Sequence, residues 1–292
     1  MQLSEFHAAR RFANTSFGQI AYVERGSGDV ALFLHGLPTN GFHWRGVIAH
    51  LAEHRRCIAL DLMGLGYSEV PESQDLSLNT QAAMIAEFLT ALSIDTVDLL
   101  ANDSGGGIAQ LFLARHEKRV RSMLLTNCDT HTNSPPPALA PFIEAARAGT
   151  LAKQFVERQL HDKRAARAAD GLGGLCYSDP ENLTDEAIEC YLSPLIASPV
   201  RISQFHRYQL SMEPNPLPAI ESALRRCQVP VRILWGTADP FFDVSWADWL
   251  DRTFPASQGV RRIDGGKVFF AEELPEVVAS EARTLWRIPV RA

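Results

Sequence analysis

Short apolar runs, each bounded by turn residues, recur along the first half of the chain and return near residue 231. Two strand-like runs come first, Arg11–Asn14 and Gln19–Glu24, and Phe17-Gly18 between them predicts a hairpin turn. Continuously apolar runs are typical of strands that are covered on both faces, as in a parallel sheet. We predict five such strands: Val30–Leu34, Cys57–Leu60, Val97–Leu100, Met123–Leu125 and Val231–Trp235.

Stretches with helical periodicity separate these strands in the first half of the chain. We predict helices at about His43–Glu53, Thr80–Leu92 and Gly106–His116. The alternation of strand and helix predicts an α/β fold with a mostly parallel, doubly wound sheet.

The alternation stops between His131 and Arg226, where no clear strand pattern is present. Helical patterns replace it at Ala138–Ala148, Leu151–Ala169 and Asp185–Leu195. We interpret residues 130–226 as a helical cap inserted after the sixth strand, with residues 1–129 and 227–292 forming the core. A separate helical domain is the alternative. The insertion is favoured because the strand pattern resumes directly after this segment.

Composition narrows the class of protein. The 292 residues are 46% apolar, which suffices for a large core, and the net charge of -6 with no basic stripe makes nucleic acid an unexpected partner. No apolar run reaches the roughly 18 residues of a membrane helix, and the first residues do not resemble a signal peptide, so no membrane association is expected. Five scattered cysteines indicate reduced thiols and a cytoplasmic protein, and no spacing suggests a metal site.

Polar motifs follow four of the predicted strands. The strand that passes Leu100 runs into Asp103-Ser104 and three glycines, which is the arrangement of a nucleophile elbow, a sharp turn that holds one side chain above the sheet. The other motifs are His35–Thr39, Asp61–Ser68 and Trp235–Pro240. With its motifs in this order, the chain resembles the α/β-hydrolase fold family across nearly its whole length. The resemblance implies an oxyanion turn in the first of these motifs and a catalytic acid in the last.

Two neighbouring residues, Asp103 and Ser104, are candidates for the nucleophile. The family's pattern is nucleophile-x-Gly-Gly-x-Ile-Ala, which Asp103 matches without a gap, whereas Ser104 would require the deletion of one residue. Asp103 is therefore favoured. Its simpler alternative role is that of a helix N-cap.

An aspartate at the elbow is similar to haloalkane dehalogenases and epoxide hydrolases. A carboxylate is ionised at neutral pH and attacks an sp³ carbon without help from a base, which forms an ester with the enzyme. A water molecule activated by histidine then attacks the ester, while the backbone N–H groups of Leu37 and Ser104 would hold the oxyanion. Dehalogenases commonly carry side-chain donors at these two positions to bind the halide, and a leucine cannot donate. The halide clamp is therefore weak or rebuilt from the cap.

The base is the largest departure from the family, because its catalytic histidine falls on Val268 and no histidine follows His206. Asp239 matches the acid that would orient such a histidine. Three replacement bases are considered: Lys267, His131 with Asp129 two residues earlier, and His206. Their simpler roles are a solvated surface lysine, a loop histidine bonded to backbone and a packing histidine.

The expected substrate is a small or medium-sized hydrophobic molecule, and no cofactor or metal is implied. The residues expected to contact it are His35 in its turn, Trp44, Tyr208, Phe241 and Phe242. Tyr208 is also similar to the cap tyrosines with which epoxide hydrolases protonate the opening oxygen, and Tyr177 or Tyr191 would be the second. A helix–helix contact is the simpler role for each tyrosine.

Three functions are compatible with these residues. The leading hypothesis is a hydrolase of an organic halide, an epoxide or an activated ester that uses Asp103 and a non-standard base. The second is a cofactor-independent lyase, isomerase or decarboxylase with Asp103 as acid or base, which the missing histidine favours. The third is a non-catalytic ligand-binding protein, against which the intact Asp103, oxyanion turn and Asp239 argue.

Overall fold

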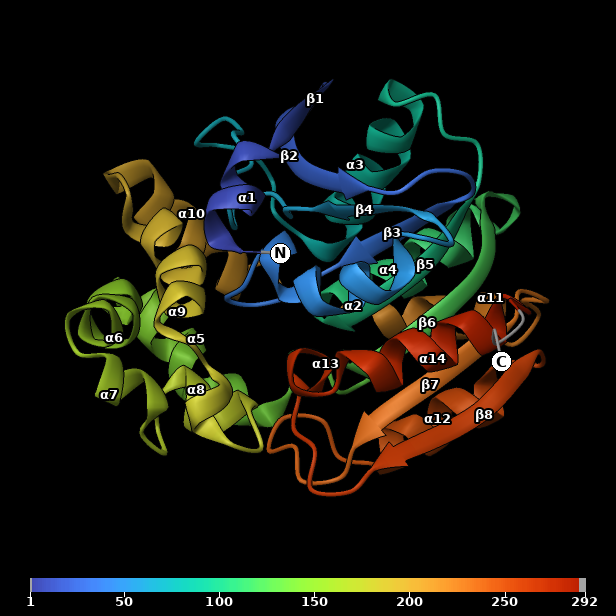
Figure 1. Cartoon of the computed structure of the whole chain (residues 1–292). Coiled ribbons are helices and arrows are strands. Elements are labelled where there is room, and N and C mark those ends of the chain that lie inside the picture. Colours follow the sequence, from blue (N-terminus) through green and yellow to red (C-terminus); the bar gives the residue numbers. More distant parts are fainter. Residues whose placement is uncertain (1, 289–292) are drawn as a thin grey trace.

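The computed structural model describes residues 2–288 and folds them around an eight-stranded sheet in the order β1-β2-β4-β3-β5-β6-β7-β8 (Figure 1). The strands are β1 Arg11–Thr15, β2 Gly18–Arg25, β3 Val30–Leu34, β4 Arg56–Leu60, β5 Val97–Asp103, β6 Val120–Cys128, β7 Val231–Gly236 and β8 Ser257–Ile263. β2 is antiparallel to both of its neighbours, and all other pairs are parallel. The seven predicted strands and the mostly parallel sheet are confirmed.

The eighth strand, β8, is absent from the prediction. It lies at the edge of the sheet, and Gln258, Arg261 and Arg262 are exposed along it. An edge strand with solvent on one side does not need a continuous apolar run, so the pattern that reveals buried strands does not reveal this one.

Helices cover both faces of the sheet, which explains why the central strands are apolar at every position. Leu32 and Leu34 of β3 pack in one cluster with α3 (Leu78–Ala91) and α4 (Ser104–Arg115). Their neighbours Ala31 and Phe33 pack in a second cluster with α2 (Arg45–Leu51) and α14 (Pro275–Leu285). Because successive side chains of a strand point to opposite faces, both layers draw on the same short run. The predicted helices at these positions are confirmed within a few residues, and α1 (Leu3–Ala8), α12 (Ser245–Thr253) and α13 (Phe270–Glu273) complete the core.

The segment between β6 and β7, which is described throughout, is helical and contains no strand. Its α-helices are α5 Ala140–Arg147, α6 Arg158–His161, α7 Lys163–Arg167, α8 Leu172–Cys176, α9 Asp185–Leu192, α10 Pro199–Leu210 and α11 Glu221–Leu224. Figure 1 shows α5 to α10 gathered beyond one end of the sheet, whereas α11 lies beside the core and contacts α4. The predicted long helix over Leu151–Ala169 is divided into Ala152–Glu157, α6 and α7, with a break at Asp162. The division into core and cap stays a prediction, and residues 1 and 289–292 lie outside the described part.

No helix in the described part of the chain is both long and apolar enough to cross a lipid bilayer. All five cysteines are buried and unpaired, as expected for reduced thiols.

Candidate functional site

The turn between β5 and α4 places Asp103 at the end of the strand and Ser104 at the start of the helix. Asp103 has φ 56° and ψ -135°, a left-handed conformation that is strained for a residue with a side chain. A Cβ at Gly105 would collide with the backbone carbonyl of His35, and one at Gly106 with the Cys128 side chain. Glycine is therefore needed for α4 to lie this close to β3 and β6, and the geometry is that of the predicted elbow.

The oxyanion turn lies directly against the Asp103 carboxylate. The N–H of Leu37 donates to Asp103 Oδ1 at 2.8 Å, and the N–H of Ser104 donates to the same oxygen at 2.6 Å. A Cβ at Gly36 would collide with this carboxylate, so the close approach depends on glycine. Both backbone donors bind Oδ1, and the other oxygen, Oδ2, takes neither bond.

Ser104 itself is fully buried, and its hydroxyl is engaged elsewhere. A hydrogen bond of 3.0 Å joins Ser104 Oγ to Tyr208 Oη on α10. Ser104 does not line the cavity beside the elbow, whereas Asp103 does. This geometry supports Asp103 as the nucleophile and gives the Ser104 side chain a bond to the helical segment.

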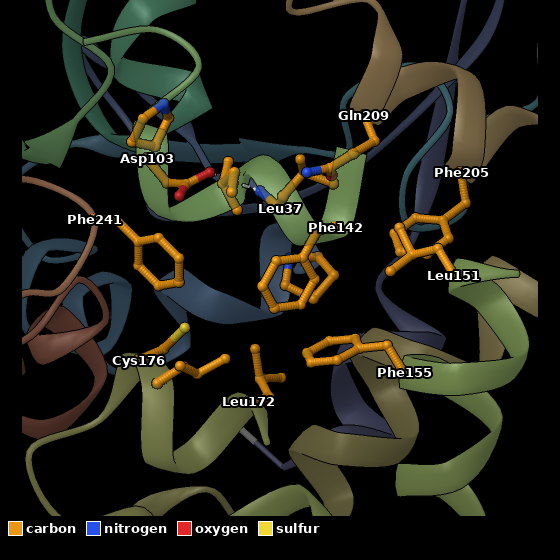
Figure 2. Close-up of a pocket in the computed structure, with 14 residues that line it drawn as sticks. Leu37, Asp103, Phe142, Leu151, Phe155, Leu172, Cys176, Phe205, Gln209 and Phe241 are labelled. Carbon is orange, nitrogen blue, oxygen red and sulfur yellow. Dashed lines mark hydrogen bonds between the residues drawn. The ribbon is translucent and has the colours of Figure 1, made fainter. Parts of the chain in front are cut away.

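A narrow cavity with a volume of about 50 Å³ lies above Asp103. Its lining consists of Leu37, Pro38, Asp103, Pro136, Leu139, Phe142, Leu151, Phe155, Leu172, Leu175, Cys176, Phe205, Gln209 and Phe241. Figure 2 shows Asp103, Phe241 and Cys176 on one side, with Leu151, Phe155 and Phe205 on the other. Only a carboxylate, a thiol and one amide interrupt the apolar wall. The cavity therefore suits a small apolar molecule held against a carboxylate.

Two carboxyl groups, those of Asp103 and Asp129, lie near each other in this region. Burial raises the pKa of Asp103, and the hydrogen bonds from the Ser104 and Leu37 N–H groups oppose that rise. Burial and then the charge of Asp103 raise the pKa of Asp129 well above its usual value, because this carboxyl group is fully buried. Burial thus disfavours a negative charge on both groups, and the charge of Asp103 adds to this effect at Asp129.

Asp239 lies in the loop after β7, as the sequence predicts. Its carboxylate accepts a hydrogen bond from Asn127 Nδ2 at 2.6 Å and one from the Phe241 N–H at 2.8 Å. Burial raises its pKa to about 7 in spite of these bonds. Val268 is 1% exposed, and its carbonyl accepts a bond from Asn102 Nδ2 at 2.8 Å. An aliphatic side chain thus occupies the position where the family has its histidine.

None of the three replacement bases lines the cavity, and each is engaged in a contact with another residue. Lys267 Nζ donates to the Gly174 carbonyl at 2.6 Å. His131 Nε2 lies 3.1 Å from Glu221 Oε2, and its ring centroid is 4.7 Å from that of Trp249. His206 Nε2 accepts a bond from the Ala152 N–H at 3.0 Å. None of the nine histidines, all within the described residues, lines the cavity, and the roles of Lys267 and His131 as bases stay predictions.

Of the five residues expected to contact substrate, Phe241 alone lines the cavity. His35 is fully buried, and its two ring nitrogens bond to the Gly36 carbonyl and the Leu62 N–H. Burial lowers the pKa of His35 to about 3, so the imidazole is neutral, and its two hydrogen bonds stabilise the turn in which it lies.

Trp44, Phe242 and Tyr208 are buried in packing contacts instead. The Trp44 ring packs 5.5 Å from Phe33 beneath the sheet, and Phe242 packs against Trp235. Tyr208 holds Ser104 as described above. Large aromatic side chains near a motif are as well suited to the core as to a cavity wall, and sequence alone does not separate the two.

Tyr177 and Tyr191 do not reach the cavity either, because both hydroxyls donate to Glu272 Oε1 at 2.7 Å. Glu272 also pairs with Arg45, and its side chain is 3% exposed. Burial acts to raise the pKa of Glu272, but the Arg45 charge, the His43 ring and the Tyr177 hydroxyl together outweigh it and lower this pKa to about 2. These tyrosines therefore belong to a buried ion-pair network that joins α8 and α9 to the core.

Gln209, a polar residue that the sequence patterns did not indicate, also lines the cavity. Gln209 is 3% exposed, and its Nε2 has no hydrogen-bond partner in the described part of the chain. No motif marks it. The available signal is its position four residues after Phe205 on α10, which places both side chains on one helix face.

Comparisons with known proteins agree with this geometry. Residues 30–274 match the protein family described as alpha/beta hydrolase fold. Haloalkane dehalogenase 2 of Mycobacterium tuberculosis is 35% identical over 117 residues, which cover 40% of this chain and 41% of that relative. The chain thus matches about two-fifths of the length of this curated relative.

Two further similarities extend over nearly the whole chain. A cis-3-alkyl-4-alkyloxetan-2-one decarboxylase of Shewanella oneidensis is 23% identical over 285 residues, which cover 92% of this chain and 86% of that protein. The solved structure of the epoxide hydrolase CorEH without ligand superposes with a TM-score of 0.76 at 23% identity, covering 95% of this chain and 98% of the other. The structural likeness shows that the fold is shared.

Proposed function

This chain belongs to the alpha/beta hydrolase fold family, and from that premise we propose that it cleaves small apolar molecules through Asp103. The substrate is an organic halide, an epoxide or an activated ester. One observation carries the proposal: Asp103 faces an apolar cavity with Oδ1 bound by the N–H groups of Leu37 and Ser104, while Oδ2 takes neither bond. The names of the dehalogenase relatives and the epoxide hydrolase neighbour support the substrate class.

The two oxygens of Asp103 suit the two steps of this chemistry. Oδ2 attacks a saturated carbon of the halide or epoxide, the bond from that carbon to the leaving atom breaks, and the electron pair departs with the leaving atom; with an activated ester, the same attack on the acyl carbon would give a mixed anhydride. Oδ1 then becomes the carbonyl oxygen of the ester, already bound by the Leu37 and Ser104 N–H groups. When water attacks the carboxyl carbon, the negative charge develops on Oδ1, where these donors stabilise it.

The second step requires a base that takes a proton from water. Asp239, which the sequence predicts as the acid that orients a histidine, becomes a candidate for this base: its pKa of about 7 suits a base at neutral pH, and its loop supplies Phe241 to the cavity wall. Lys267 and His131 remain alternatives. Because no histidine lines the cavity, we expect the ester to break down slowly and to accumulate.

Intact mass measurement after incubation with alkyl halides, epoxides and activated esters tests the proposal. We expect a persistent adduct with one of these classes, mapped to the peptide that contains Asp103. The adduct should be absent from Asp103→Asn and unchanged in Asp95→Asn, an exposed aspartate just before β5, at the end of that strand opposite the elbow. An equal adduct in Asp103→Asn would contradict the proposal.

A second candidate function is a lyase reaction, which two observations favour. No histidine reaches the cavity, and the relative that covers most of this chain is named as an oxetanone decarboxylase. Loss of carbon dioxide from a four-membered lactone gives an alkene and consumes no water, so no water-activating base is needed. Repeated turnover in ¹⁸O-labelled water separates the two functions, because a hydrolase places the label first in the Asp103 carboxylate and then in its product, whereas a lyase places it in neither. Ligand-dependent stabilisation with neither adduct nor product would favour a binding protein.

A further inference from the structure

Gln209, which lines the cavity that contains Asp103, carries a buried amide nitrogen with no protein partner. The side chain is 97% removed from solvent, and Nε2 lacks a hydrogen bond in the described part of the chain. Buried N–H donors in folded proteins are nearly always paired. An unpaired donor at a cavity wall is therefore suited to a partner that enters with the ligand.

We propose that Gln209 donates a hydrogen bond to the acceptor atom of the substrate, the halogen or oxygen that leaves the carbon attacked by Asp103. Gln209 is then a specificity-determining residue, and the cavity selects apolar molecules that carry one uncharged acceptor. That the acceptor is the leaving atom rests on the proposed function. That the cavity prefers ligands with an acceptor rests on the cavity alone.

The other donors near Asp103 are already engaged or are absent. The N–H groups of Leu37 and Ser104 both bind Asp103 Oδ1, and the Ser104 hydroxyl bonds to Tyr208. The Leu37 side chain cannot donate, and the Cys176 thiol is a weak donor. Among the residues that line the cavity, Gln209 supplies the one amide N–H donor from a side chain. Negative charge that develops on a leaving atom in so apolar a cavity needs such a donor.

The structure fixes the position of this donor relative to the elbow. Tyr208, the preceding residue, is bonded to Ser104, which follows Asp103. Two arginines hold α10 against core loops, since Arg201 donates to the Gly66 carbonyl and Arg207 to the Gln74 carbonyl, each at 2.6 Å. Because the cavity has a volume of only about 50 Å³, a ligand acceptor bound by Gln209 and a ligand carbon beside Asp103 lie in the same small space. Figure 2 shows both side chains at the same cavity, with Leu37 between them.

A matched pair of unreactive probes tests the acceptor preference without any chemistry at Asp103. Cyclopentanone and methylenecyclopentane have nearly the same shape, and only the ketone carries an acceptor. We expect the wild-type chain to bind the ketone about 10-fold more tightly, since one hydrogen bond of a buried donor is worth about that ratio. Gln209→Met keeps the volume, removes the donor and should abolish the preference. Gln209→Leu serves if the methionine variant does not fold.

The control is Gln154→Met, which changes an exposed glutamine of the same segment that does not line this cavity and should keep the preference. A wild-type chain that does not prefer the ketone, or a Gln209→Met variant that still prefers it, would overturn the inference.

A reactive arm separates this inference from the proposed function. With butyl chloride and butyl iodide, Gln209→Met should slow formation of the Asp103 adduct about 10- to 100-fold for the chloride, and less for the iodide, a better leaving group and a weaker acceptor. If the ketone is preferred because of Gln209 but no probe forms an adduct, Gln209 is a hydrogen-bond donor to the ligand and the proposal that Asp103 is a nucleophile is wrong. If the adduct forms equally fast in the wild type and in Gln209→Met, Asp103 is the nucleophile and the proposed role of Gln209 is wrong.

Discussion

The backbone N–H of Leu37 lies 2.8 Å from Oδ1 of Asp103, a hydrogen bond that joins residues 66 positions apart in the chain. The bond exists because the turn after β3 and the elbow after β5 leave neighbouring parallel strands at the same edge of the sheet. In the proposed chemistry, this donor meets the oxygen that becomes the ester carbonyl and then the oxyanion. The site is therefore organised before a substrate arrives.

Replacing Ser104 by alanine separates its backbone from its side chain. Ser104→Ala keeps the N–H that binds Asp103 and loses the hydroxyl that bonds to Tyr208. We expect the rate of adduct formation to change by less than about 3-fold, while the free energy of unfolding falls by about 1 kcal/mol. Adduct kinetics and urea unfolding measure the two effects. Complete loss of the adduct in Ser104→Ala would instead identify the serine as the nucleophile.

Asp129 should destabilise the protein at neutral pH. The pKa of Asp129 in the folded protein is raised well above its pKa in the unfolded chain, which is about 4. At a pH above about 4, folding therefore takes up a proton. The stability of the wild type therefore declines as the pH rises above about 4, until the folded pKa is reached. We expect Asp129→Asn, which cannot ionise, to be more stable by at least about 1 kcal/mol at pH 7 and nearly equal at about pH 4.

Urea unfolding of both proteins at the two pH values measures this difference. An Asp129→Asn variant that is less stable than the wild type at neutral pH would show that the carboxylate is charged and paired in the folded protein.

Asp239 should control the breakdown of the ester if it acts as the base. A base works in its ionised form, so the breakdown rate in the wild type should rise with pH through about 7, the pKa of Asp239. Asp239→Asn should slow breakdown by at least about 10-fold and remove this rise. The decay of the adduct, followed by intact mass over a pH series, measures both effects. Lys267→Met and His131→Ala are compared in the same series, and a larger loss in either variant would transfer the role of base to it.

Histidine at position 268 should restore a base of the kind that the family uses. Val268 is 1% exposed, so the larger ring costs about 1–3 kcal/mol of stability, but it stands in the loop where the family's histidine falls. We expect Val268→His to speed breakdown of the Asp103 adduct at least about 10-fold, because a positioned general base contributes 10²–10⁴-fold. Val200→His, an exposed position on α10, is the control that adds an imidazole elsewhere. An unchanged adduct lifetime in a folded Val268→His variant would count against ester formation at Asp103.

The hydrophobic pattern predicts most of the fold because burial on two faces leaves a visible mark on a strand. Ala31, Leu32, Phe33 and Leu34 alternate between two helical layers, so none of them can be polar, and a run of this kind is unambiguous. The pattern fails at β8, an edge strand in which Ile263 is the one buried residue. It fails again at Asp162, where a single cap residue breaks a long helical pattern.

The amino-acid sequence by itself determined the family, the strained elbow at Asp103 and the absence of a histidine at Val268, because each depends on residue types at fixed spacing along the chain. Only the tertiary structure decided which side chains meet above the elbow. Trp44 and Tyr208 turn into packing contacts, whereas Gln209, which no motif marks, reaches the cavity. The physical reason is that a side chain's surroundings depend on how separate helices pack against the sheet, and local spacing does not encode that packing.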